Sequence, residues 1–451
     1  MASLAEDGAN FLNRLEDVLA KARRAGADAA DIVYGEGTSL SLSYRLGKPE
    51  NMERSEGTDL GLRVLIGKRQ AIVSTSDINE TALDELVERA VSMARVVPED
   101  EFCGLAPENL LAGDLPDLDE CDPVEPSADV LKDRARTTED AALAVDGVTN
   151  SEGAEAGWGL SHVAVAGTNG FVRTRVRSHH SVGAAVLAGE GTEMERDYDW
   201  TSAVHAEDLM DPAEIGRSAG EKTVRRLNPR KVSSTSAPVV YDPRVSSSLI
   251  SHLAGAVNGS SVARGTTFLK DRMETSVFSD VVTIVDDPLR KRGLRSKAFD
   301  GEGVATSKMN LIENGVLQTW VLDLRSSRQL GLETTGNASR GTSSPPSPSV
   351  TNLYMEPGDL DPDELIADID QGLYVTGMMG RGIDMITGDY SRGAEGFWIE
   401  NGRIAFPVSE LTIAGNLNDM FKNLTAASNL EFRYGTNAPT LRVDGMTIAG
   451  K

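Results

Sequence analysis

Hydrophobic residues recur every three or four positions near the start of the chain and then at every second position. The helical spacing covers residues 11–22 and returns over residues 83–94, where Asn79 stands in the position of an N-terminal cap. Between them, residues 40–46 and 60–66 alternate apolar and polar side chains, the pattern of a strand with one buried face. These patterns predict an N-terminal α/β domain whose helices lie on an antiparallel sheet.

Three Asn-Gly dipeptides stand between alternating apolar runs, at 169–170, 314–315 and 401–402. Each predicts a hairpin with a type I′ turn, because that turn needs positive φ at both central residues. Two of the three lie after residue 230. The C-terminal part is therefore predicted to be β-rich and antiparallel, with a barrel- or sandwich-like form, so the fold class is α+β.

A domain boundary is predicted near residue 229. A helix-like segment opens at Asp211-Pro212 and ends before Pro229, which gives an N-terminal domain of residues 1–228 and a C-terminal domain of residues 229–451. Within the first, residues 97–130 are rich in proline and acids and contain no Lys or Arg. We interpret this segment as an extended, solvated connection that wraps over the surface, with an acidic docking tail as the alternative.

The charge balance narrows the choice of partner and compartment. Lys and Arg number 45 against 69 Asp and Glu, giving a net charge of −24, which opposes binding to nucleic acid or to an anionic membrane. The only cysteines, Cys103 and Cys121, form no CxxC motif, and no apolar stretch has the length of a signal or membrane segment. We therefore expect a cytoplasmic protein.

Several short motifs carry little weight. Residues 216–220 match GxSxG but lie inside the helix-like segment, and the Gly-Lys-Arg at 67–69 lacks the rest of a phosphate loop. No two of the five histidines have the spacing of a helical zinc pair. Arginines at 173, 175 and 177 would share one strand face, which could bind carboxylates but is more simply a solvated face.

Two glycine-rich segments are harder to explain as generic turns. Residues 299–303 read FDGEG, and residues 388–398 read GDYSRGAEGFW before the third Asn-Gly turn. Glycine mixed with charged and aromatic residues at the start of a strand indicates a backbone that presents polar groups. From the residues alone, a functional site and a structural turn network stay equally open.

These segments carry a resemblance that spans nearly the whole chain. The run TGDYSRGAEGFWIENG at 387–402, the run PVSELTIAGNL at 407–417 and FDGEGV at 299–304 resemble the PmbA/TldE branch of the TldD/PmbA family. The opening helix, residues 57–76 and the GLETTG at 331–336 also fit. The resemblance implies a subunit of a paired cytoplasmic metallopeptidase that degrades or trims unfolded peptides, in peptide antibiotic maturation and antitoxin degradation.

The resemblance also implies where a metal would lie. The TldD-type subunit holds zinc through HExxxH on a helix and a later cysteine, with the glutamate as general base. In the matching helix of this chain, Ser251 and Ala256 replace the two histidines and His252 replaces the glutamate, and no cysteine follows Cys121. We therefore expect no metal ligand and no catalytic residue here, with zinc bound by a TldD-like partner subunit.

The size of the activation that zinc provides supports the expectation that this chain has no catalytic residue. Zinc lowers the pKa of bound water from about 15.7 to about 7, which amounts to about 12 kcal/mol of activation. A lone histidine acting as general base supplies about 3 to 5 kcal/mol. The resemblance assigns contacts with peptide or partner to Asp389, Tyr390, Ser391 and Arg392, with His252 as a relic of the metal site. Arg392 could bind a peptide carboxylate.

Two alternatives stay open. A stand-alone hydrolase could bind Mg²⁺ or Ca²⁺ through carboxylates such as Asp286, Asp287, Asp300 and Glu302. A non-proteolytic regulatory protein is the other alternative, in line with an older description of the family as modulators of DNA gyrase. Whether the isolated chain forms a homodimer is not decided by the sequence.

Overall fold

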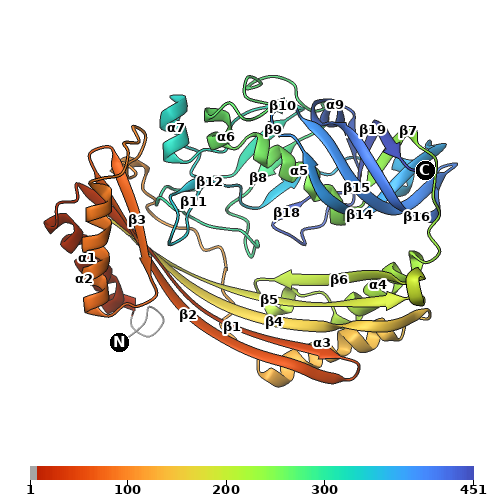
Figure 1. The fold of residues 1–451 in the computed structure, drawn as a ribbon, viewed down its shortest axis with the longest axis horizontal. Coiled ribbons are helices and arrows are strands. Elements are labelled where there is room, and N and C mark those ends of the chain that lie inside the picture. Colours follow the sequence, from red (N-terminus) through yellow and green to blue (C-terminus); the bar gives the residue numbers. More distant parts are fainter. Residues whose placement is uncertain (1–7) are drawn as a thin grey trace.

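The computed structural model describes residues 8–451 as a long curved sheet facing a β-rich body (Figure 1). The curved sheet is antiparallel and has the strand order β3-β2-β1-β4-β5-β6. Its strands are β1 (Ala29–Arg45), β2 (Lys48–Ile66), β3 (Arg69–Thr75), β4 (Val148–Gly167), β5 (Val172–Ala188) and β6 (Glu195–Ala203). The concave side of this sheet faces the β-rich body, and the helices α1, α2 and α3 lie along its outer side (Figure 1).

Helices cover one face of this sheet. Even-numbered residues of β1, such as Ile32 and Leu42, are buried against them, whereas the odd-numbered residues point to the other face. The expected helices and the Asn79 cap are confirmed, since the Asn79 side chain accepts the Ala82 N–H at 2.9 Å. The covering helices are α1 (Gly8–Arg24), α2 (Glu80–Ala94), α3 (Ala128–Leu143) and α4 (Pro212–Arg225).

The second half contains a closed barrel. Its strands follow the order β16-β15-β14-β7-β19, and β16 pairs again with β19 to close the ring. The expected α+β fold with a barrel-like C-terminal part is thus confirmed, although β7 and β14 pair in parallel. The barrel strands are β7 (Thr235–Tyr241), β14 (Gln371–Ile383), β15 (Asp389–Glu400), β16 (Arg403–Asn416) and β19 (Leu441–Ala449), with β17 (Leu424–Ala426) added on β19.

A smaller sheet and short helices complete this body. The sheet order is β10-β9-β8-β13-β18, and a two-stranded ribbon joins β11 to β12. These strands are β8 (Ile284–Asp286), β9 (Met309–Glu313), β10 (Val316–Leu317), β11 (Ala338–Ser339), β12 (Ser347–Pro348), β13 (Leu353–Met355) and β18 (Thr436–Asn437). The helices are α5 (Pro243–Ala256), α6 (Gly259–Ala263), α7 (Leu324–Leu330), α8 (Pro362–Ile366) and α9 (Leu417–Lys422). Over residues 8–451, none of the helices has the length and apolar character needed to cross a bilayer.

All three expected hairpins form, but one turn differs from its prediction. Asn314 and Asn401 have φ of 48° and 49° and precede glycines with positive φ, as a type I′ turn requires. Asn169 does not have positive φ, so the type I′ assignment is wrong there. The β4–β5 loop is longer, and the Asn169 amide instead donates to the Ala106 carbonyl at 2.9 Å.

The acidic segment 97–130 lies between the two halves of the molecule. Up to Ser127, the cap of α3, it contains no helix or strand apart from a short 3-10 turn, Glu108–Leu110, and its last three residues begin α3. The Ala112 N–H donates to Gly303 O at 2.9 Å, and the Glu120 carbonyl accepts the Ser178 N–H at 3.1 Å. The segment therefore contacts the curved sheet on one side and the β-rich body on the other.

Candidate functional site

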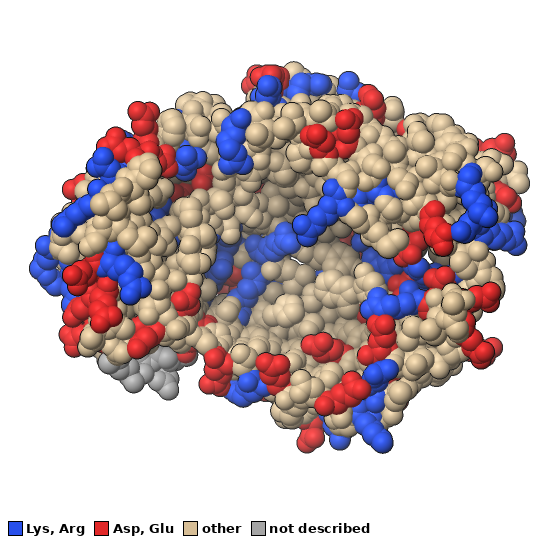
Figure 2. Space-filling model, in the orientation of Figure 1, with Lys and Arg blue, Asp and Glu red and all other residues tan. Residues whose placement is uncertain are grey.

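A deep hollow separates the curved sheet from the β-rich body, and the space-filling view looks into it (Figure 2). The helix-free face of the curved sheet turns toward this body. Trp200 of β6 packs against Tyr434 with ring centroids 5.1 Å apart, and Arg177 of β5 donates to the carbonyl of Ser296 at 3.3 Å. The hollow is therefore bounded by the helix-free face and by loops of the C-terminal half.

The middle of the helix-free face carries almost only small side chains. Across the sheet, Ser39 pairs with Gly159 and Ser41 with Gly157. A recess of about 460 Å³ lies over the neighbouring residues Ser181, Gly183 and Trp200, among others. Because glycine and serine have small side chains, they leave backbone groups accessible, and this face has room for an extended polypeptide. The serine hydroxyl groups can form hydrogen bonds with that polypeptide. The small residues are Gly35, Gly37, Ser39, Ser41, Ser43, Gly157, Gly159, Ser161, Ser181 and Gly183.

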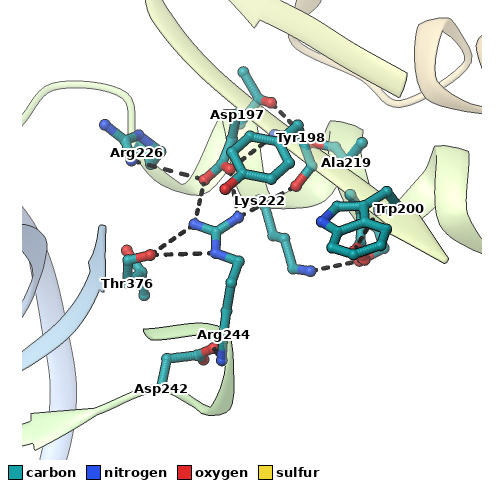
Figure 3. Close-up of polar contacts among 12 residues, drawn as sticks. Asp197, Tyr198, Trp200, Ala219, Lys222, Arg226, Asp242, Arg244 and Thr376 are labelled. Carbon is teal, nitrogen blue, oxygen red and sulfur yellow. Dashed lines mark hydrogen bonds and ion pairs between the residues drawn. The ribbon is translucent and has the colours of Figure 1, made fainter. Parts of the chain in front are cut away.

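An ion-pair cluster closes one end of the hollow. Arg244, in the first turn of α5, donates to Asp197 of β6 at 2.6 Å and to the Thr376 carbonyl at 2.8 Å (Figure 3). Arg226, just after α4, lies 3.7 Å from the Asp197 carboxylate and 2.6 Å from that of Glu395. Because these pairs join strands and helices of both halves, they fix the distance between the sheet and the barrel at this end.

A buried charge cluster closes the other end. Asp31 of β1 accepts two hydrogen bonds from Arg63 of β2, and Arg340 from the C-terminal half lies 2.7 Å from the same carboxylate. The Arg340 side chain is completely buried. Burial works against ionisation of Asp31, but Arg340 and Arg63 outweigh it and hold the pKa of Asp31 below its usual value.

The structure brings together three of the five predicted site residues. Tyr390 and Arg392 share one face of β15, and the Tyr390 ring lies edge-on to His252 of α5, with centroids 6.0 Å apart. Burial and the nearby Arg392 lower the pKa of His252 to about 4. Asp389 and Ser391 alternate to the exposed face, so the segment 389–392 belongs to a strand and its side chains do not converge on one pocket.

Most of these groups have partners within the chain. Hydrogen bonds from Asn416 and Thr387 lower the pKa of Asp389, and Arg392 Nε donates to the Met379 carbonyl at 3.2 Å. Tyr390 is 1% exposed and inside the core. The exposed Ser391 is therefore the member of the segment whose side chain is most open to a ligand.

The helix α5 does not offer a zinc site. The Ser251 hydroxyl is exposed and donates to the Ser247 carbonyl at 2.9 Å, whereas Ala256 is fully buried in the core. Only His252 carries a nitrogen ligand, and zinc sites in proteins use three or four protein ligands. In residues 8–451, no three His, Cys, Asp or Glu side chains come together in a way that could hold a metal ion. The residues present do not fit a zinc ion.

Of the four carboxylates in the alternative metal hypothesis, Asp286, Asp300 and Glu302 are buried and Asp287 is half-buried. Asp286 accepts hydrogen bonds from Thr351 and Asn337, and Asp300 accepts three backbone N–H groups, among them that of Ala338. Burial raises the pKa of Asp300, and burial together with Asp300 raises the pKa of Glu302 to about 8. The buried carboxylates are thus occupied by hydrogen bonds within the chain, and the four do not form a cluster that could hold a metal ion within residues 8–451.

Two features of the hollow escaped the sequence analysis. The solvated face expected for the arginine stripe is wrong for Arg177, which is mostly buried and donates to carbonyls of Gly293 and Ser296. The segment that it contacts, residues 290–297, reads RKRGLRSK and has five cations without an acid. A net charge of −24 does not reveal such a local run of cations, which shows only when charge is followed along the sequence.

Comparisons with known proteins agree with the fold. Models of the PmbA/TldA metallopeptidase match as domain 1 at residues 30–94, as the central domain at 121–227 and as the C-terminal domain at 234–450. The chain is 37% identical over 430 residues to the metalloprotease PmbA of Escherichia coli O157:H7, covering 94% of this chain and 93% of the relative.

Solved structures resemble the whole chain as well. A proposed modulator of DNA gyrase from Bacteroides thetaiotaomicron superimposes with a TM-score of 0.89 at 28% identity, over 97% of this chain and 98% of that one. TldE from Thermococcus kodakarensis superimposes with a TM-score of 0.86 at 22% identity, over 97% of this chain and all of the other, and this likeness concerns the fold alone.

Proposed function

Because this chain belongs to the TldD/PmbA metallopeptidase family, we propose that it is the TldE/PmbA-like subunit of a heterodimeric zinc peptidase. The catalytic partner is a TldD-like chain that binds the zinc ion, which when bound supplies a nucleophilic water. This chain contributes no ligand to that ion. Its role is to form the subunit interface and one wall of the chamber in which unfolded peptides are cleaved.

The observation that carries the proposal is the chemistry of α5. Where the family's metal-binding subunit has two histidines, this chain has an exposed hydroxyl at Ser251 and a buried methyl group at Ala256. The remaining His252 is held neutral near pH 7 by burial and by Arg392. One neutral imidazole, packed against a core tyrosine, cannot replace the activation of water by zinc.

The helix-free face supports a peptide as the substrate. Its small residues leave a wide surface of backbone and hydroxyl groups beside a recess of about 460 Å³. An extended chain can hydrogen-bond such a surface through its backbone regardless of sequence, which suits the degradation or trimming of unfolded peptides. Antibiotic precursors and antitoxins in the cytoplasm are proposed substrates of this kind.

The decisive experiment compares the chain alone with the chain plus a TldD-type partner. Both are purified after expression with zinc, and cleavage of an unstructured fluorogenic peptide is measured with and without a chelator. We expect cleavage only from the mixture, abolished by the chelator, and a mixed complex in size-exclusion chromatography. Zinc-dependent cleavage by the chain alone would overturn the assignment.

A non-proteolytic role is the second candidate, because a similar solved structure is described as a proposed modulator of DNA gyrase. With a net charge of −24, this chain would have to act on the gyrase protein and not on DNA. Affinity purification separates the two functions: recovery of a gyrase subunit without a TldD-like chain favours this candidate, and recovery of the TldD-like chain favours the first.

A further inference from the structure

A pocket of about 300 Å³ opens between the two halves, beside the edge strand β6. Ser202 and Ala203 of β6 form one side, the loop 290–294 forms another, and Phe432 and Tyr434 form an aromatic wall. Ser202 pairs with Ser181, which belongs to the small residues of the helix-free face. The pocket is therefore continuous with the surface on which an extended peptide would lie.

The cations of this pocket differ in their partners. Arg292 is neutralised by Asp119, Glu207 and Asp208, at distances from 2.6 to 3.1 Å. Arg290 and Lys291 have no carboxylate within 4 Å in the part of the chain that the structure describes. The pocket thus presents two cationic groups, Arg290 and Lys291, that no carboxylate of the described residues contacts, in a protein of net charge −24.

Contacts on either side of Lys291 hold this loop in place. The Arg290 guanidinium lies over the Phe432 ring, 3.5 Å from its centroid, and the backbone N–H of Arg292 donates to Leu118 O at 2.8 Å. The amides of Asn352 and Asn437 are used in hydrogen bonds within the chain. The groups left free for a ligand are the two cationic heads and the exposed part of the aromatic wall.

We propose that this pocket binds a free carboxylate of the peptide substrate, with the adjoining side chain against Phe432 and Tyr434. The proposal rests on the proposed function for the identity of the ligand as a peptide. A guanidinium and an ammonium group pair well with one carboxylate, and the pairing is strongest where water is partly excluded. A nucleic acid is a poorer fit, because its many phosphates would approach a protein surface dominated by acids.

The test measures binding to the full chain without any partner subunit. The probe is an unstructured hexapeptide that ends in phenylalanine, carries a neutral dye at its N-terminus and has a free C-terminal carboxylate. Two matched peptides separate the sources of the carboxylate: one has a C-terminal amide, and the other has that amide and an internal glutamate. Fluorescence anisotropy gives the dissociation constant of each, at low and at high salt.

We expect the free acid to bind at least about tenfold more tightly than the plain amide, with weaker binding at high salt. Arg290→Met and Lys291→Met should each raise the dissociation constant of the acid about tenfold while leaving the amide unchanged. The control Lys132→Met removes an exposed cation from α3, on the helical face, and should change neither. A preference for the glutamate-containing amide would assign the pocket to acidic side chains.

Three results would overturn the proposal: equal binding of acid and amide, no effect of Lys291→Met, or a lack of saturable binding of the acid. Displacement of the acid by single-stranded DNA at lower concentration than by acidic peptide would assign the pocket to nucleic acid instead. Since no partner is present in this assay, its failure is distinct from a failure to form a mixed complex. Circular dichroism of each variant excludes loss of fold as the cause.

Discussion

The buried cluster of Asp31, Arg63 and Arg340 offers the sharpest test of how the two halves are held together. Asp31→Asn removes the carboxylate that both guanidinium groups contact and leaves two buried cations without that anion between them. Arg340→Met leaves the Asp31–Arg63 pair intact. We therefore expect the loss of one anion to destabilise the protein more than the loss of one of the two cations.

The expected loss in the free energy of unfolding follows from the burial of this charge cluster. Breaking a buried ion pair by removing one partner costs about 3 to 5 kcal/mol, because an uncompensated charge stays inside. For a chain of 451 residues, the unfolding entropy is about 0.95 kcal/mol/K. Asp31→Asn should then lower the melting temperature by about 3 to 5 °C, and Arg340→Met by less than half of that.

The assay is differential scanning calorimetry of the two variants beside a matched control. Asp84→Asn makes the same change in an exposed pair with Lys21, where we expect a loss below about 1 kcal/mol. If Asp31→Asn melted within 1 °C of Asp84→Asn, or if Arg340→Met were the more damaging variant, the reasoning about the buried charges would be refuted.

Three further predictions concern other buried or closely packed positions. Glu302→Gln should stabilise the protein by about 2 to 4 kcal/mol at pH 8 and hardly at all near pH 4. The pKa of Glu302 is raised to about 8 in the folded protein, so the wild-type protein loses stability as the pH rises from the unfolded pKa toward that value. Urea unfolding at both pH values measures the difference. His252→Gln should raise the free energy of unfolding by about 1 to 3 kcal/mol at pH 5 and change it little above pH 7, since the lowered pKa of His252 costs stability only where the imidazole of the unfolded chain is protonated. Melting curves over a pH series test this, and a larger gain at pH 8 than at pH 5 would contradict it. Gly61→Ala should lower the free energy of unfolding by about 1 to 3 kcal/mol, because its Cβ would meet the backbone of Thr342 in the C-terminal half. An unchanged unfolding midpoint would show that the two halves can move apart at this contact.

Local signals allowed much of the fold to be predicted from the sequence. The helices α1 and α2 have clear apolar periodicity, and the Asn-Gly turns at 314 and 401 need only their own two residues to specify positive φ. Asn169 failed as a type I′ turn because its amide makes a tertiary contact with Ala106. The parallel pairing of β7 with β14 joins strands more than a hundred residues apart, which no local pattern encodes.

The site was predictable only in part, for a similar reason. Residues 389–392 were identified by resemblance, and their alternation on a strand separates Tyr390 and Arg392 from Asp389 and Ser391. The proximity of His252 to Tyr390 depends on how α5 lies against barrel strands far away in sequence, such as β14. Likewise, residues 290–294 of the basic run line a pocket only because Phe432, about 140 residues later in the sequence, packs beside them.

Native mass spectrometry of the complex formed with a TldD-like chain, after exhaustive dialysis against metal-free buffer, tests the division of labour between the subunits most directly. The masses report both the composition of the assembly and the number of zinc ions that it retains. We predict a mixed assembly that keeps zinc, with the ion leaving with the partner when the subunits are separated. A zinc ion retained by this chain alone would contradict the account.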